Sequence, residues 1–141
     1  MDEFYSLGFL LHRASVALSK SLNAALGNSG IDLPHSQFIV LRCLYYKDGI
    51  SQLEIANLLS KDAAAIKRTI DNLEKKGLVE RRPVRNLKNS VCITDKGKGM
   101  IPQALKIGEN VINEALRGDN KEDITLLKTM LESIYMNLGK K

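Results

Sequence analysis

The 141-residue sequence predicts a single, mainly α-helical domain that carries one small β-hairpin. Apolar residues recur at spacings of three and four over most of the chain, a pattern typical of amphipathic helices. Two short β-prone runs, LVERRPV and NSVCIT, interrupt this pattern in the second half of the sequence. With 44% hydrophobic residues, a chain of this length can bury a core of its own.

The first predicted helix covers residues about 3 to 26, and the turn sequence GNSG follows it. Its heptad-like apolar seam consists of Phe4, Leu7, Leu11, Ala14, Leu18 and Ala25. Pro34 suits the first turn of a second helix, which stops near Asp48 and Gly49.

Two short helices come next. Ser51 and Glu54 have the spacing of a capping box, so a helix is expected from Ser51 to about Leu59. Asp62 can cap the following helix. In that helix Ile66, Ile70 and Leu73 form one apolar stripe that must face the core. The outward face is left to Ala63, Ala64, Lys67, Arg68 and Asn72.

Gly77 closes this helix, and the two β-prone runs form a hairpin with the basic tip RNLK. Pro83 indicates that the first strand lies at an edge or ends there, because proline cannot donate to a neighbouring strand. Thr94 and Asp95 start a helix that runs to roughly Arg117. After RGDN the last helix carries Ile124, Leu127, Leu131, Ile134 and Leu138 at helical spacing.

The positive charge is concentrated in the middle of the chain. Residues 61 to 98 contain eleven basic and five acidic residues, a net of +6, whereas the whole chain carries +5. Two short helices with a tight turn, followed by a basic hairpin, are typical of a winged helix-turn-helix DNA-binding domain. The second helix would then enter the major groove, and the hairpin would be the wing.

The stretch SQLEIANLLSKDAAAIKRTIDNLEKKGLVERRP, followed by SVCITDKGKGMIPQAL, resembles the multiple antibiotic resistance regulator (MarR) family of bacterial transcription factors. This resemblance extends over essentially the whole chain. It implies one domain over residues 1–141, with dimerisation helices at 3–30 and 118–141 and a DNA-binding lobe at about 32–98. It also implies a homodimer on a pseudo-palindromic operator, usually a repressor of a nearby operon that a small molecule or oxidation releases. The wing departs from the family pattern, because RNLKNSVCIT lacks the usual Asp-x-Arg pair.

The expected site residues fall into three groups. The predicted DNA contacts are Lys61, Ala63, Ala64, Ala65, Lys67, Arg68, Arg82, Arg85 and Lys88. The predicted dimer interface consists of Phe4, Leu7, Leu11, Ile124, Leu127 and Leu131. The resemblance implies an effector pocket where the first, second and fifth helices meet the DNA-binding lobe. The candidate residues for this pocket are His12, Tyr45 and Met100. For Tyr45 and Met100, packing in the core is the simpler expectation.

Other classes of protein are less consistent with the sequence. It has no Ser/His/Asp arrangement and no phosphate-binding glycine loop, so no enzyme is expected. Cys43 and Cys92 lack the spacing of a metal site and are expected to be small core residues. His35 is expected to be solvated. Neither a metal nor a cofactor is therefore predicted. The acidic N-terminus and the absence of a long apolar run predict a cytoplasmic protein without a membrane span. A non-sequence-specific architectural DNA binder is the alternative function.

Overall fold

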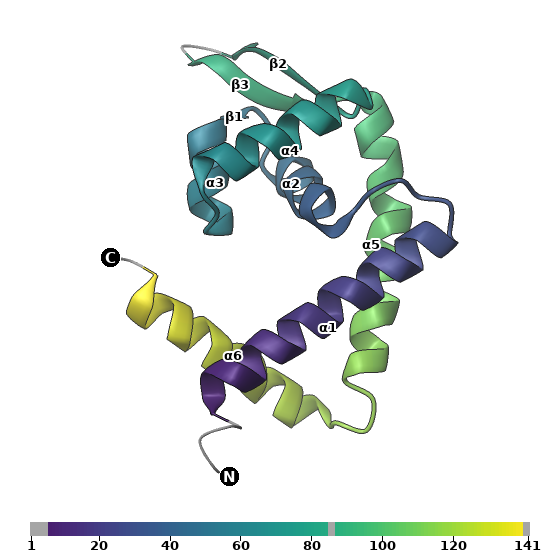
Figure 1. Cartoon of the computed structure of the whole chain (residues 1–141), viewed down its shortest axis with the longest axis vertical. Helices are drawn as coiled ribbons and strands as arrows, with labels where there is room; N and C mark the ends of the chain where they lie inside the picture. Colours follow the sequence, from purple (N-terminus) through teal and green to yellow (C-terminus); the bar gives the residue numbers. More distant parts are fainter. Residues whose placement is uncertain (1–5, 85–86, 140–141) are drawn as a thin grey trace.

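The computed structural model describes residues 6–84 and 87–139, with the side chains of residues 84, 87 and 88 left undescribed. The elements follow the predicted order, with one additional short strand (Figure 1). They are α1 (Leu7–Asn28), α2 (His35–Tyr46), β1 (Ile50–Ser51), α3 (Gln52–Leu59), α4 (Ala63–Lys75), β2 (Val79–Val84), β3 (Leu87–Ile93), α5 (Asp95–Ala115) and α6 (Lys121–Leu138). None of the helices in this described part is long and apolar enough to cross a membrane.

Side-chain caps begin α3, α4 and α5, as the sequence predicts. The Ser51 hydroxyl accepts from the backbone N–H of Glu54, and the Asp62 carboxylate accepts from the N–H of Ala65 at 2.8 Å. Thr94 caps α5 in the same way. These caps satisfy N–H groups that have no partner inside a helix, so the predicted starts of α3, α4 and α5 are confirmed.

The sheet is larger than the predicted hairpin. Its three antiparallel strands lie in the order β1-β3-β2, because Ile50 and Ser51 pair with Val91 and Ser90. Two residues are too few to show a strand periodicity, so β1 could not be predicted from the sequence. The predicted four-residue tip is also too long, since β3 already begins at Leu87. Pro83 lies on the edge strand β2, where the register is irregular, as expected.

The hydrophobic core lies between α2, α3, α4, the sheet and the first half of α5. Its fully buried side chains include Leu41, Leu44, Ile55, Ile70 and Leu73. By contrast, α1 buries only two residues near its C-terminal end and α6 buries none. Figure 1 shows α6 and the N-terminal half of α1 standing apart from the lobe that contains α2, α3 and α4. The chain therefore has one well-packed lobe and a set of long helices that leave it.

Candidate nucleic-acid interface

The amphipathic helix α4 presents a small and cationic surface. Ile66, Ile70 and Leu73 are buried beneath it, as the apolar stripe predicts. Ala63 and Ala64 are exposed in the first turn, whereas Ala65 is half-buried and presents less of its methyl group. A helix with such a first turn can bring its backbone close to another surface, since no long side chain stands in between.

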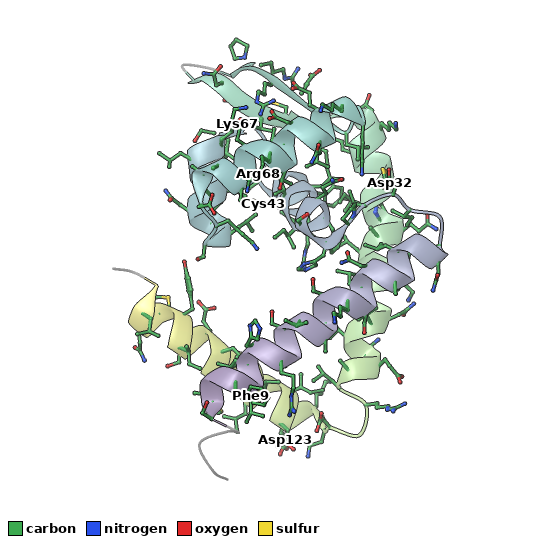
Figure 2. The ribbon with its side chains drawn as sticks, in the orientation of Figure 1. Phe9, Asp32, Cys43, Lys67, Arg68 and Asp123 are labelled. Carbon is green, nitrogen blue, oxygen red and sulfur yellow. The ribbon has the colours of Figure 1, made fainter. Side chains whose placement is uncertain are left out.

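The cations of α4 follow one turn later. Lys67 and Arg68 are both exposed and come from the middle of the helix (Figure 2). Lys67 forms an ion pair with Asp71 at 3.1 Å, and its hydrogen bond, together with one from Arg81, lowers the pKa of the Asp71 carboxyl. Within the described residues, no ion pair or hydrogen bond involves the Arg68 guanidinium. The Arg68 guanidinium is therefore available to an external anion or base.

Arg81, which is not among the predicted site residues, joins the wing to both helices of the helix-turn-helix. Its Nη2 lies 2.7 Å from Asp71 Oδ1, and its Nη1 lies 2.7 Å from Glu74 Oε1, both on α4. Its Nε donates to Gln52 Oε1 of α3 at 2.9 Å. A planar guanidinium held at three points fixes the orientation of β2 against α4. A basic residue in a β-prone run could not by itself indicate this role.

The remaining predicted DNA contacts lie beside α4 or on the wing. Lys61 is exposed in the turn before α4. Arg82 is exposed on β2 and pairs with Glu80 at 3.5 Å. Arg85 lies outside the described residues, as does the side chain of Lys88, so their roles stay predictions.

The predicted dimer residues form an apolar surface on the long helices. Leu7, Leu127 and Leu131 are exposed, and Leu11 and Ile124 are half-buried. Phe4 is not among the described residues. A groove of about 780 Å³ runs between α1, α5 and α6, and its walls include Leu11, Leu18, Val111, Leu127 and Leu131. Of the predicted dimer residues, Leu11 of α1 and Leu127 and Leu131 of α6 thus line one groove, whereas Leu7 and Ile124 do not line it.

A second cavity of about 630 Å³ lies where α1, α2 and α5 meet, with one residue from α6. Its polar lining includes His35, Arg42, Tyr46, Glu109 and Lys128, and its apolar lining includes Leu22, Phe38, Ile39 and Leu105. None of His12, Tyr45 and Met100 lines either this cavity or the larger groove. His12 and Tyr45 are exposed, whereas Met100 packs against the core.

His35 is not the solvated histidine that the sequence suggested. Its Nδ1 lies 3.1 Å from the Ser19 hydroxyl, and its backbone N–H donates to Asn23 Oδ1 at 2.6 Å. Burial lowers the pKa of its imidazole, and the charge of Lys61 lowers this pKa further. His35 finds these partners because Ser19 and Asn23 lie one turn apart on α1 and face the start of α2.

The cysteines are placed as predicted. Cys92 is buried in β3, and Cys43 is half-buried in α2, where burial raises the pKa of its thiol. No group of three or more His, Cys, Asp or Glu side chains that could hold a metal ion occurs in the described part of the chain.

Comparisons with known proteins agree with this geometry. The MarR family profile matches residues 33–86, from the loop before α2 to the wing. An uncharacterised HTH-type transcriptional regulator of Bacillus subtilis, YdgJ, is 32% identical over 109 residues, which is 76% of this chain and 66% of that protein. Multiple antibiotic resistance protein MarR of Escherichia coli is 29% identical over 136 residues, covering 94% of this chain and 93% of that protein.

Solved structures show the same architecture. A variant of E. coli MarR complexed with operator DNA has a TM-score of 0.83 at 28% identity and covers 95% of this chain and 99% of its own. CouR from Rhodococcus jostii, bound to p-coumaroyl-CoA, has a TM-score of 0.79 at 25% identity and covers 92% of this chain and 91% of its own. The winged helix-turn-helix lobe, the long flanking helices and these similarities lead to one conclusion: the chain belongs to the MarR family of DNA-binding transcriptional regulators.

Proposed function

We propose that this protein is a homodimeric repressor that reads a pseudo-palindromic operator with α4 of each protomer. The observation that carries the proposal is the outward face of α4, where exposed Ala63 and Ala64 precede exposed Lys67 and Arg68. An alanine methyl can contact a thymine methyl, and an arginine can donate two hydrogen bonds to guanine. The similarity to the E. coli MarR variant solved with operator DNA supports this role for α4. The proposed role is one of binding rather than catalysis.

The dimer would use residues 3–30 and 118–141, leaving residues of about 32–98 to bind DNA. Support comes from the apolar groove between α1, α5 and α6 and from the exposed leucines of α6, Leu126, Leu127 and Leu131. Leaving such a surface in water is unfavourable, at roughly 25 cal/mol for each Å² of apolar area. A second copy of the same helices would cover it and would place two α4 helices on one duplex.

The effector would bind in the cavity between α1, α2 and α5. Arg42 and Lys128 supply two positive charges there against the one negative charge of Glu109, and Phe38 and Ile39 supply apolar walls. This chemistry suits an organic anion with an apolar body. A relative of the same fold, CouR, is solved with p-coumaroyl-CoA, an anion of this kind.

Operator binding is tested by fluorescence anisotropy at one fixed salt concentration. The probes are duplexes from the DNA flanking the gene of this protein and random duplexes of equal length. A sequence-specific reader should bind one flanking duplex at least about 1000-fold more tightly than random DNA. Nearly equal affinities would instead support the architectural alternative.

The effector site is tested by release from the identified operator. Benzoate and p-coumaroyl-CoA serve as probes, because both combine an anionic group with an apolar ring. Arg42→Gln should prevent release by an anion while leaving operator affinity unchanged, since Arg42 lies on α2 rather than on α4. Equal release from the parent and the variant would place the effector elsewhere.

A further inference from the structure

The C-terminal end of α4 is tied to the loop between α1 and α2 by one lysine. Lys76 Nζ donates to the backbone oxygen of Asp32 at 2.9 Å and to Gln37 Oε1 at 2.6 Å. The same nitrogen lies 3.2 Å from the Asp32 carboxylate, and Asp32 itself lies in the α1–α2 loop (Figure 2). The ammonium group therefore donates two hydrogen bonds within the protein, and the Asp32 carboxylate balances its charge. The Lys76 side chain is only 26% exposed, and Gln37 is buried.

The loop that Lys76 reaches is itself held in place. Its Ile31 N–H donates to the carbonyl of Leu26 at 2.9 Å, at the end of α1. At its other end, Asn23 of α1 accepts from the backbone N–H of His35, the first residue of α2. A lysine bound to this loop is therefore bound to the end of α1.

The same corner of the lobe is also joined to the start of α5. Lys96 Nζ donates to the carbonyl of Lys76 at 2.8 Å, and Thr94 Oγ1 donates to the carbonyl of Gly77 at 2.6 Å. The backbone N–H of Thr94 donates to the carbonyl of Leu78 at 3.0 Å. Residues 76–78 thus connect the end of α4 to both α1 and α5, the two long helices that leave the lobe.

We propose that Lys76 is a positioning residue that sets the angle of α4 relative to α1 and α5, and through it the half-site spacing that the dimer binds. The inference rests on the proposed function, because spacing matters only for a dimer that reads two half-sites. In such a dimer, half-site spacing is a geometric consequence of how each recognition helix is held. Lys76 acts through Asp32 and Gln37 rather than on DNA, since its ammonium group already donates to two protein oxygens and is paired with the Asp32 carboxylate.

The test compares the parent with Lys76→Met on the operator and on duplexes with one base pair added or removed between the half-sites. One base pair moves a half-site by about 3.4 Å and rotates it by about 35°. The parent should bind the altered duplexes about 100-fold more weakly, because one half-site loses its base contacts. Lys76→Met should lose only about 10-fold, because its α4 can adjust.

The matched control is Lys75→Met. Lys75 is an exposed neighbour on the last turn of α4, and no hydrogen bond or ion pair joins its ammonium group to another described residue. Its replacement removes the same charge but should keep the spacing dependence of the parent. Both variants should also keep a dimeric mass.

Several results would overturn the inference. An unchanged 100-fold dependence in Lys76→Met would show that α4 is held by other contacts, and a salt slope lower by about one unit would show that Lys76 contacts a phosphate. Should Lys76→Met fail to fold, the double variant Lys76→Met with Gln37→Leu is assayed in its place. This double variant leaves no buried acceptor unpaired, because Gln37 is also replaced by an apolar residue. If this variant also fails to fold, Lys76 has a purely structural role and the inference is wrong. A folded parent without operator preference would refute the proposed function, and this inference with it.

Discussion

Replacing Gly97 with alanine should destabilise the fold, although alanine is the better helix former. Gly97 lies buried in the first turn of α5. A Cβ atom at this position would lie 2.8 Å from Ile93 Cγ1 and 3.3 Å from Leu41 Cδ1, and closer still to the carbonyl oxygen of Leu78. Two of these neighbours are core side chains and the third is backbone, so none can easily move away. Only glycine lets α5 approach the start of β2 so closely.

The size of the effect follows from opposing contributions. Alanine should gain about 1 kcal/mol over glycine in helix propensity. Overpacking a filled core costs about 1–3 kcal/mol. A shift of α5 would also weaken the hydrogen bond from Thr94 N–H to the Leu78 carbonyl, worth about 1 kcal/mol. The net loss is about 1–3 kcal/mol, and a loss of 2 kcal/mol would lower the melting temperature by roughly 6–10 °C.

Gly99→Ala is the matched control for this prediction. It lies in the same helix, but nothing stands within 4 Å of the position of its Cβ atom. The change should therefore raise the free energy of unfolding by about 0.5–1 kcal/mol. Both variants are measured by urea and thermal unfolding, followed by circular dichroism. A Gly97→Ala protein at least as stable as the parent would refute the close approach of α5 to the Leu78 carbonyl.

Three further predictions concern DNA reading, assembly and pH. Ala64→Gln should change the operator preference in anisotropy assays. Because Ala64 is exposed on α4, the free energy of unfolding should stay within about 0.5 kcal/mol of the parent value. An unchanged preference would mean that the alanines are only helix formers. Leu11 and Leu127 both lie in the groove wall, so the double variant Leu11→Asp and Leu127→Asp should be a monomer by light scattering and should no longer bind the operator. A variant that remains dimeric would contradict a dimer interface at this groove. The pKa of His35 lies below its ordinary value of 6.5, so the unfolded state takes up the proton first as the pH falls through that value. The parent should therefore lose stability relative to His35→Gln between about pH 7 and pH 5 in urea unfolding, and parallel curves would show that His35 is not buried in its neutral form.

Much of the winged helix-turn-helix lobe could be predicted from the sequence, because its local structure depends on residues that are close together in the chain. The caps at Ser51 and Asp62 are hydrogen bonds across three residues. The orientation of α4 follows from the stripe of Ile66, Ile70 and Leu73, which must leave water together. Both kinds of signal repeat within a helical turn or two, so they can be recognised without knowing the path of the chain.

The connections between elements were decided only by the tertiary structure. Lys76 bonds to a carbonyl 44 residues earlier, and Arg81 to an amide 29 residues earlier. A lysine and an arginine in a basic stretch look alike in sequence whether they face DNA or hold the lobe together. His35 likewise is half-buried in the folded chain, where Ser19 and Asn23 of α1 are its hydrogen-bond partners. Periodicity in the sequence shows which face of a helix turns inward. A long polar side chain, however, bonds to whichever partner lies within about 3 Å in the folded chain, and the identity of this partner depends on how the helices and strands pack.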